Sequence, residues 1–362
     1  MKNKIAFIVP YPIGVAPSQR FRFEQYIDLL EQNNYQCSCY SFLTLKDYRL
    51  LYKPGNLIRK IWAIIKGFFK RTRLIFTLRS FSIVFIHREA SPIGPPVFEY
   101  IITKILKKKV IYDFDDAIWL KNTSQSNKLV SNIKKHSKVS SICKWSSLIM
   151  CGNHYLMSYA QNYNEHSICI PTTIDTKNLH NKIKAHHNEK IIIGWTGTHS
   201  TSKYLYQIEN LLAELQLKHD FIFKVISNQD PKFETLKYKY TPWSIDNEID
   251  ELLTFDIGLM PLYDDDWSKG KCGFKALQYM ALEIPTIVSP VGVNTEIIKD
   301  GENGYFANND EEWREKIALL INSSELRSKL GKEGRKTVVN NYSTEANKNN
   351  YLNYFNKLVH AK

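Results

Sequence analysis

Short apolar runs alternate with longer amphipathic segments along this chain, and the whole alternation occurs twice. Buried parallel strands are near-continuous apolar runs of about four to eight residues, and the segments between them are long enough for crossover helices. The first series predicts strands at Ile5–Val9, Gln36–Phe42, Ile83–Ile86, Val110–Tyr112, Leu148–Met150 and Ser167–Ile170. The second series predicts strands at Ile191–Thr196, Phe221–Ile226, Ile257–Met260 and Thr286–Val288.

This doubled pattern predicts an α/β protein of two doubly wound, Rossmann-like domains that face a cleft. We expect the domains at residues 1–171 and 191–340, joined by a polar linker at residues 172–190. A C-terminal helix at residues 341–362 is expected to pack back on the first domain. Because ligands of such sheets bind beyond the carboxyl ends of the strands, chemistry is expected in the loops that follow them.

Charge is distributed unevenly between the two halves. Residues 1–171 contain 25 Lys or Arg and 10 Asp or Glu, a balance of +15, whereas residues 172–362 contain 24 and 26, a balance of −2. Two stretches contribute most: Tyr48 to His87 has nine basic residues and Ala117 to Asn164 has six, with no carboxylate in either. The first domain is therefore expected to meet an anionic partner.

The cysteines and the N-terminal residues indicate the cellular compartment in which the protein is expected. The six cysteines are scattered, without a CxxC pair or a zinc-type spacing, which is typical of reduced, buried thiols in a cytosolic protein. The apolar run Ile5–Val9 is too short for a signal peptide, and no apolar stretch reaches the roughly 18 residues that cross a bilayer. We expect a cytoplasmic protein or one attached to a membrane from that side.

Three turns in the second half have the composition of phosphate-binding loops. The first follows a strand and contains Thr196, Gly197, Thr198 and, at the next helix, Lys203. Small residues let backbone amides approach a phosphate, hydroxyls donate to it, and a helix N-terminus favours its charge. The same arrangement also serves as a plain connection.

The other two turns reinforce this interpretation. One carries the residues Lys269, Lys271, Gly273, Phe274 and Lys275, which combine cations with free amides at a helix start. The last places Gly292, Val293 and Asn294 after a strand and before a helix. The alternative for the lysine-rich turn is a solvated basic loop capped by Gly273, but three such turns in one domain favour a nucleotide ligand.

At this point the sequence resembles a known family. The second half contains the stretches IGWTGTHSTSKYL, DIGLMPL, KCGFKALQYMALEIPTIVSPVGVNTEII, DGENGYF and ELRSKLGKEGRKTV. The first half contains SQRFRFEQY, FIHREASPIGPP, VIYDFDDAIW and IPTTID. Together they resemble glycosyltransferase family 4, retaining enzymes of the GT-B fold, and in particular its bacterial surface-polysaccharide members.

The resemblance implies where a UDP- or GDP-sugar donor binds. It implies diphosphate contacts from Thr198, Lys203 and the amides near Gly273, and sugar contacts from Gly292–Asn294. It further implies close backbone approach at Gly14 and a ribose or sugar contact at Gln278. The chain departs from the family's two glutamates separated by seven residues, because Gly270 and Gln278 stand at the matching positions.

Three carboxylates, Asp113, Asp115 and Asp116, follow the predicted strand Val110–Tyr112. The family commonly has a histidine at the position of Asp115, so we expect Asp115 and its neighbour Asp116 to be catalytic. They would orient sugar hydroxyls, stabilise oxocarbenium character or accept the acceptor's proton. The alternatives are helix capping and a metal-binding DxD motif formed with Asp113, as in the GT-A fold. The complete second α/β series argues against GT-A, so no metal or other cofactor is expected.

Basic residues near the same strand ends are candidates for acceptor binding. Arg20, Arg22, His87 and Arg88 follow the first and third predicted strands, where guanidinium groups hold phosphates bidentately. The alternative is a set of surface salt bridges, for example between Arg88 and Glu89. The run Asp264–Asp266 is interpreted as a solvated loop.

The segment from Leu57 to Phe76 predicts an amphipathic helix with aromatic residues on one face and cations on the other. Such a helix enters a lipid headgroup layer. The predicted membrane contacts are Trp62, Lys66, Phe68, Phe69, Lys70, Arg71 and Arg73. The alternative is a crossover helix whose apolar face is buried against its own sheet. Nucleic acid is not an expected partner, because the stacking aromatics of RNA modules are absent.

These features together predict a metal-independent, peripheral membrane glycosyltransferase. It would move a sugar from a nucleotide sugar to a polyprenyl-diphosphate-linked saccharide at an anionic membrane surface, on the inner face of the cell membrane. Two other classes remain open: a nucleotide-sugar epimerase of the same fold, and a non-catalytic membrane-binding subunit. An epimerase would convert a nucleotide sugar without an acceptor, and a non-catalytic subunit would bind no donor.

Overall fold

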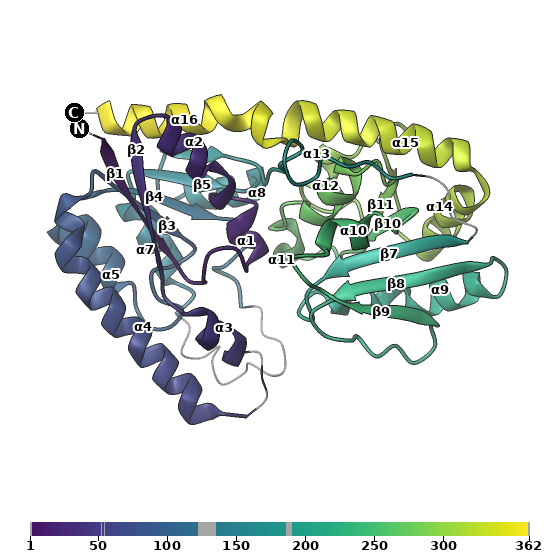
Figure 1. Ribbon diagram of the computed structural model, residues 1–362, viewed down its shortest axis with the longest axis horizontal. Coiled ribbons are helices and arrows are strands. Elements are labelled where there is room, and N and C mark those ends of the chain that lie inside the picture. The colour runs from purple at the N-terminus through teal and green to yellow at the C-terminus, as the bar shows by residue number, and fades with distance from the viewer. Residues whose placement is uncertain (1, 52, 54, 122–134, 186–189, 361–362) are drawn as a thin grey trace. The chain divides into compact units, whose positions relative to one another are not determined.

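The computed structural model describes residues 2–51, 53, 55–121, 135–185 and 190–360 (Figure 1). Parts of the second basic stretch (122–134), of the expected linker (186–189) and of the C-terminus (361–362) lie outside the described residues. The chain divides into two compact units, residues 1–172 with 348–362 and residues 173–347.

An all-parallel sheet of six strands in the order β2-β1-β3-β4-β5-β6 forms the centre of the first unit. Its apolar runs pair in register, so that Ile5 lies between Cys37 and Ile83. The strands are β1 (Asn3–Val9), β2 (Tyr35–Ser41), β3 (Ile83–His87), β4 (Lys109–Phe114), β5 (Leu148–Cys151) and β6 (Ser167–Cys169). The α-helices are α1 (Pro17–Arg20), α2 (Ile27–Gln32), α3 (Leu45–Leu51), α4 (Leu57–Thr77), α5 (Val97–Tyr100), α7 (Lys138–Trp145) and α8 (His154–Gln161), with α16 (Thr344–His360) continuing into this unit.

Helices cover both faces of this sheet. One face packs against the segment around α2 and the C-terminal half of α16, where Tyr26 and Tyr351 stack with ring centroids 4.1 Å apart. The chain moves across the sheet in one direction from β1 to β2 and in the opposite direction from β2 over β1 to β3. Because both crossovers are right-handed, the second one places α4 on the other face of the sheet. Figure 1 shows α4 and α5 together on that side.

The second unit repeats the plan with the strand order β12-β11-β10-β7-β8-β9, again all parallel. Its strands are β7 (Ile191–Gly197), β8 (Phe221–Ser227), β9 (Tyr238–Pro242), β10 (Ile257–Met260), β11 (Thr286–Val288) and β12 (Tyr305–Phe306). Its α-helices are α9 (Glu209–Gln216), α10 (Glu248–Leu252), α11 (Asp266–Lys269), α12 (Phe274–Ala281), α13 (Asn294–Ile297), α14 (Asp310–Asn322) and α15 (Ser324–Thr337). The predicted α/β class with two doubly wound sheets is confirmed.

Two features of the second unit differ from the sequence expectations. The strands β9 and β12 were not predicted, because one is polar and half-exposed and the other has only two residues. Residues 173–185 were expected within a linker, but they pack on the second unit. The buried Lys184 pairs with Asp256 at 3.2 Å, and its amide donates to the Leu282 carbonyl at 2.8 Å.

Each sheet has one point where the chain reverses its direction of winding. In the first unit this point lies between β1 and β3, and in the second it lies between β7 and β10. Crossover helices leave to opposite faces there, which opens a crevice at the carboxyl ends of the two strands. The loops that carry Gly14, Arg88, Thr198 and Lys269 all follow these four strands. The topology therefore puts the predicted site loops at the two switch points.

Candidate functional site

The Gly14 loop of the first unit is held in shape by buried polar side chains. The Gly14 amide donates to Glu24 Oε2 at 2.9 Å, and Gln19 Nε2 donates to Glu24 Oε1 at 3.0 Å. Burial raises the pKa of Glu24, although Gln19 and the Gly14 amide oppose the shift. Gly14 has φ +83°, which favours glycine, and the space where a Cβ would stand is empty. This loop therefore leaves room for a ligand close to its backbone.

Arg88 gathers the two predicted catalytic carboxylates. Its Nη1 atom lies 3.1 Å from Asp115 Oδ1 and 2.9 Å from Asp116 Oδ2. Burial raises the pKa of Asp115, as does the Asp116 charge, and Arg88 opposes both. One guanidinium thus pairs with two adjacent carboxylates, and burial beside Asp116 makes Asp115 bind a proton more readily than an exposed carboxylate. Arg88 was predicted to bind the acceptor; its observed partners are Asp115 and Asp116, and Glu89 pairs instead with Lys138 at 2.7 Å.

The backbone at Arg88 is fixed from several sides. Arg88 has φ +60°, an uncommon value for a residue with a side chain. Its amide donates to the Asp113 carbonyl at 2.7 Å, and its carbonyl accepts from the Tyr112 hydroxyl at 2.8 Å. Two residues further on, Ala90 accepts from Arg71 at 2.7 Å and donates to Glu99 at 2.8 Å. A strained residue clamped by buried groups is typical of a site that positions a side chain.

A second buried cluster lies at the ends of β3 and β4. Asp113 accepts from Arg22, and its Oδ2 atom lies 2.7 Å from His87 Nδ1. Burial raises the pKa of Asp113, but Arg22 and His87 outweigh it and hold the pKa below its usual value. The His87 Nε2 atom is buried, and none of the described residues accepts from it or donates to it. His87 is thus oriented by Asp113 with one ring nitrogen unused.

The positions of Arg22 and Arg20 differ from the expectation. Arg22 is only 4% exposed, and it donates to the Ile170 carbonyl as well as to Asp113. The charge of Arg22 is therefore balanced in the interior of this structure, and its acceptor role stays a prediction. Arg20 is half-buried, with its guanidinium 5.0 Å from the Phe21 ring centroid, and its acceptor role stays a prediction.

Asp113 and Asp115 do not present a shared pair of carboxylates. Both oxygens of Asp113 are engaged by Arg22 and His87, while Asp115 pairs with Arg88. A divalent-metal DxD motif needs both carboxylates to face the ion, so this donor set fits structural and proton-handling roles better than metal binding. Among the described residues, no group of three His, Cys, Asp or Glu side chains is arranged to hold a metal ion.

The three predicted donor turns come together in the second unit. A Cβ on Gly292, which has φ +56°, would stand 2.8 Å from the Lys269 carbonyl oxygen. A Cβ on Gly273, which has φ +66°, would overlap the Ile297 side chain and lie 3.6 Å from Asn294 Oδ1. The first turn is joined to the second through Ser268, whose hydroxyl donates to the Tyr204 hydroxyl at 3.1 Å. Glycine at 273 and 292 is required by this close packing as well as by φ.

Most amides of the first turn are already bound within the protein. The Thr198 amide donates to Thr201 Oγ1 at 3.2 Å, and the His199 amide donates to Asn228 Oδ1 at 2.8 Å. Thr196 is also fixed, because its amide donates to the Tyr279 hydroxyl at 2.9 Å. A phosphate at this turn would therefore meet hydroxyls, such as that of Thr198 paired with Ser200 at 2.8 Å, more than backbone amides.

The lysines of this region lie beside aromatic rings or carboxylates. Lys275 Nζ lies 5.6 Å from the Trp195 ring centroid, Lys271 Nζ lies 5.1 Å from that of Trp267, and Lys203 Nζ lies 5.1 Å from that of Tyr204. Lys269 pairs with two exposed carboxylates, Asp264 at 3.5 Å and Asp266 at 3.6 Å, and these raise its pKa. Each of the four lysines therefore has an aromatic ring or a carboxylate as a neighbour within the second unit.

Gln278 and Asn294 are less accessible than a ligand contact needs. Gln278 is 1% exposed, and its Nε2 atom lies 3.5 Å from His180 Nε2. Asn294 is equally buried, and its Nδ2 atom donates to the Ser289 carbonyl at 3.0 Å. Their donor contacts stay predictions, and both side chains brace the walls of the site in this structure.

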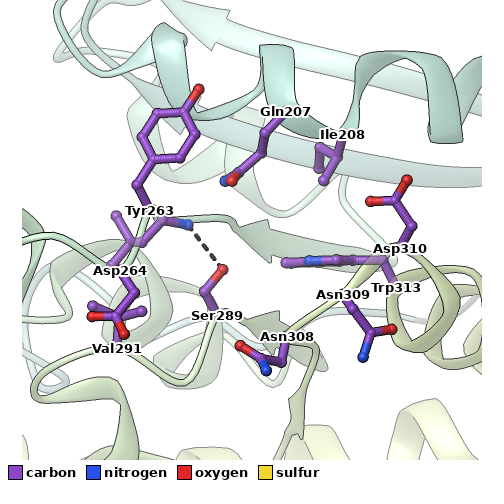
Figure 2. A pocket seen from close by; sticks show the side chains of 11 residues that line it. Gln207, Ile208, Tyr263, Asp264, Ser289, Val291, Asn308, Asn309, Asp310 and Trp313 are labelled. Atoms are coloured by element: carbon purple, nitrogen blue, oxygen red, sulfur yellow. Dashed lines mark hydrogen bonds between the residues drawn. The ribbon is translucent and has the colours of Figure 1, made fainter.

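A polar hollow of about 230 Å³ lies beside these turns, and sequence reasoning missed it (Figure 2). It is lined by residues that follow β10, β11 and β12, among them Tyr263, Ser289 and Asn308–Asp310. The Leu262 amide donates to Ser289 Oγ at 3.0 Å, which closes one wall. None of the described lysines or arginines lines the hollow, so it suits a neutral polar group better than a diphosphate. Its signal in the sequence is weak, because the lining residues are spread over four loops.

The predicted membrane residues separate into two groups on α4. Trp62, Lys66, Phe69, Lys70 and Arg73 are exposed. Arg71 is 2% exposed and donates to the carbonyls of Val9, Tyr40 and Ala90, so its predicted membrane contact is wrong. Phe68 is half-buried, with its ring 5.5 Å from that of Phe42 and 5.9 Å from that of Phe98. Within the described part of the chain, no helix has the length and apolarity to cross a membrane.

The sequence of the second unit matches a known family. Residues 167–337 match the family model described as "Glycosyl transferases group 1", slightly less than half of the chain. The capsular polysaccharide biosynthesis glycosyltransferase CapM of Staphylococcus aureus is 22% identical over 260 residues, which are 68% of this chain and 63% of that protein. The chain spans less than two thirds of the length of the curated relatives that it matches.

Solved structures extend the likeness to the whole fold. Sucrose-phosphate synthase from Thermosynechococcus elongatus superposes with a TM-score of 0.74 at 12% identity, over all of both chains. Anabaena Alr3699/HepE, solved in complex with UDP and glucose, superposes with a TM-score of 0.65 at 12% identity, over 98% of this chain and 100% of that one. The protein therefore has the two-domain α/β fold of GT-B glycosyltransferases, and its second unit matches the glycosyl transferases group 1 model.

Proposed function

We propose that this protein is a retaining glycosyltransferase of family 4 that contributes to a surface polysaccharide. The observation that carries the proposal is the meeting of three glycine turns and four lysines within the group 1 domain. The relation to CapM supports a role in polysaccharide synthesis, because that protein is named for capsular polysaccharide biosynthesis.

The proposed donor is a nucleoside-diphosphate sugar bound to the second unit. Its diphosphate would lie against the hydroxyls of Thr198 and Ser200 and the ammonium groups of Lys203 and Lys271, with the sugar toward Gly292. Fixed cations near a helix start stabilise negative charge as the diphosphate departs. The HepE structure holds UDP and glucose, which supports this class of donor.

The proposed chemistry places Asp115 and Asp116 at the reacting sugar. The bond between C1 and the diphosphate oxygen breaks with its electron pair on the diphosphate, and an acceptor hydroxyl forms the new bond to C1 on the same face. Asp115 would take the hydroxyl proton, and the net negative charge of its cluster with Arg88 would stabilise the cationic sugar. We propose that no metal is needed, since lysines offset the diphosphate charge.

The proposed acceptor is a saccharide linked to a polyprenyl diphosphate, presented at the inner face of the cell membrane. The +15 balance of residues 1–171 supports an anionic, lipid-linked acceptor and a peripheral cytoplasmic location.

Replacement of Asp115 by Asn tests the proposed role of the carboxylate. A positioned proton acceptor contributes about 100-fold to 10,000-fold to rate, so we expect D115N to lower turnover by about 100-fold or more. Donor affinity, measured by calorimetry with UDP- and GDP-sugars, should stay within about twofold, because the proposed diphosphate contacts all come from residues of the second unit. The matched control is D28N, which changes an exposed carboxylate on helix α2. Unchanged turnover in D115N would remove Asp115 from the mechanism.

A further inference from the structure

Helix α4 exposes its largest apolar side chains on the side that faces away from its sheet. Trp62 is 57% exposed, Phe69 is 63% exposed and Phe76 is 78% exposed, and Ile58, Ile61 and Ile65 are exposed as well. At 100° per residue these six positions fall within an arc of about 100°. We refer to these six residues as the outer stripe. A crossover helix packed by its apolar face would bury these side chains, whereas here they are exposed.

Small residues and one arginine make the opposite face of α4 its packing face. Ala63, Gly67, Arg71 and Leu74 are the buried residues of this helix. A Cβ on Gly67 would overlap the Phe42 ring, so the helix approaches its own domain closely through glycine. Arg71 then fixes its rotation with hydrogen bonds of 2.7, 2.8 and 2.6 Å to three backbone carbonyls. The outer stripe is therefore held outward by the fold and has no freedom to turn inward.

Cations flank the outer stripe along one side. Arg59, Lys66, Lys70 and Arg73 are exposed and lie between the stripe and the packing face. No ion pair with a described residue forms at any of these four, and no carboxylate occurs from Tyr48 to His87. Whatever covers this face must therefore supply negative charge and accept aromatic rings at the same time.

We infer that the outer stripe and its flanking cations dock the protein on an anionic lipid surface. The occupant is the headgroup layer of a bilayer, with α4 lying parallel to it over about 31 Å, the length of 21 helical residues. Trp62 and Phe69 insert beside the acyl chains, while the four cations contact lipid phosphates. This inference deepens the proposed function, because it names the surface on which a lipid-linked acceptor would be met.

Vesicle flotation tests the inference without donor or acceptor. The full chain should float with vesicles that contain about one third phosphatidylglycerol and bind phosphatidylcholine vesicles about tenfold more weakly. Reversal of three flanking cations, K66E/K70E/R73E, should lower affinity for the anionic vesicles by about tenfold or more. Loss of two insertion residues, W62S/F69S, should lower it to a similar extent, and the residual binding should disappear at high salt.

Matched controls in the second unit distinguish docking through α4 from nonspecific effects of net charge and of exposed apolar side chains. K218E/K237E/K239E makes the same change of net charge at exposed lysines, and L217S/I245S removes two exposed apolar side chains. Both controls should float like the unchanged protein. The inference would be overturned if the unchanged protein did not float, or if the controls lost as much binding as the α4 variants.

Two other occupants of the stripe give distinct results. If a second copy covered it, sedimentation would show a dimer that W62S/F69S converts to a monomer, and vesicle binding would not depend on Trp62 or Phe69. If a protein partner covered it, the purified chain would be monomeric and would not float. Either result contradicts the lipid inference. Transfer to a water-soluble acceptor measures the proposed function separately, so that flotation with no transfer would contradict only the enzyme proposal.

Discussion

Arg88 is the residue on which the chemistry of the first unit depends most. It contacts both Asp115 and Asp116, and its uncommon backbone conformation is held by Tyr112 and by the clamp on Ala90. A guanidinium shared by two carboxylates lets one of them lose its proton at a lower pH than burial alone would allow. If Asp115 is the proposed base, Arg88 is a positioning residue that sets the pH at which Asp115 can accept a proton.

Replacement of Arg88 by Gln should move the pH dependence of transfer. Burial and Asp116 raise the pKa of Asp115 while Arg88 lowers it, so removal of the cation raises that pKa further. The acid limb of kcat/KM, where Asp115 gains its proton, should shift upward by about one pH unit or more. The loss of activity in R88Q should therefore be larger at low pH than at high pH.

The conservative variant R88K keeps the positive charge and should leave the acid limb close to that of the unchanged enzyme. A constant ratio of activities between R88Q and the unchanged enzyme across the whole pH range would show that Arg88 does not tune Asp115.

Some site residues could be predicted from the sequence, and others could not. Strand ends mark Asp115, Arg88 and Gly14 as candidates, because parallel sheets bring their ligands to that edge. The sequence does not distinguish Arg22 or Arg71 from exposed arginines, since burial of a guanidinium depends on carbonyls and carboxylates that are distant in the chain. Arg22 meets Asp113 across 91 positions, and Arg71 meets Val9 across 62.

Helix α4 has the clearest division between a buried face and an exposed face. Arg71 and Arg73 are two residues apart, yet one is buried among three carbonyls and the other is exposed. Arg71 also contacts Val9 at the end of β1 and Ala90, two residues after Arg88, so it joins α4 to the segments next to Gly14 and Arg88.

Replacement of Arg71 by Met should destabilise the protein by about 3 kcal/mol or more, because three backbone carbonyls lose hydrogen bonds from a charged donor, each worth about 1.5–3 kcal/mol. The matched variant R73M should change the free energy of unfolding by less than about 0.5 kcal/mol, as exposed substitutions usually do. Urea denaturation monitored by tryptophan fluorescence measures both. Equal and small effects would show that the three carbonyl contacts do not hold the helix.

The elements themselves were predicted to different extents. Long apolar runs such as Ile191–Thr196 identified the central strands, since burial on both faces requires continuous apolar residues. The edge strands β9 and β12 were not predicted, because an edge strand is half-exposed and has no continuous apolar run. The segment 173–185 looked like a linker, and its packing depends on one buried lysine, Lys184, whose partner Asp256 lies far along the chain.

At the scale of the whole molecule, two sheets of the same design carry different charge and different loops. The first unit holds the carboxylate cluster and the cationic helix, and the second holds the glycine turns and the match to glycosyl transferases group 1. This division of labour follows from the doubled strand pattern, because each switch point offers one ligand crevice. In the proposed mechanism, the donor binds at the second crevice and the residues of the first crevice take the proton.

Transfer of a labelled sugar is the most direct measurement of the proposed glycosyltransferase activity. The purified protein is incubated with a panel of radiolabelled UDP- and GDP-sugars, with and without a lipid extract that contains polyprenyl-linked saccharides. We expect label from one donor to enter the lipid phase with release of an equal amount of nucleoside diphosphate. D115N should suppress both, and a chelator should suppress neither. Conversion of a nucleotide sugar without lipid, or no turnover of any donor, would contradict the proposed activity.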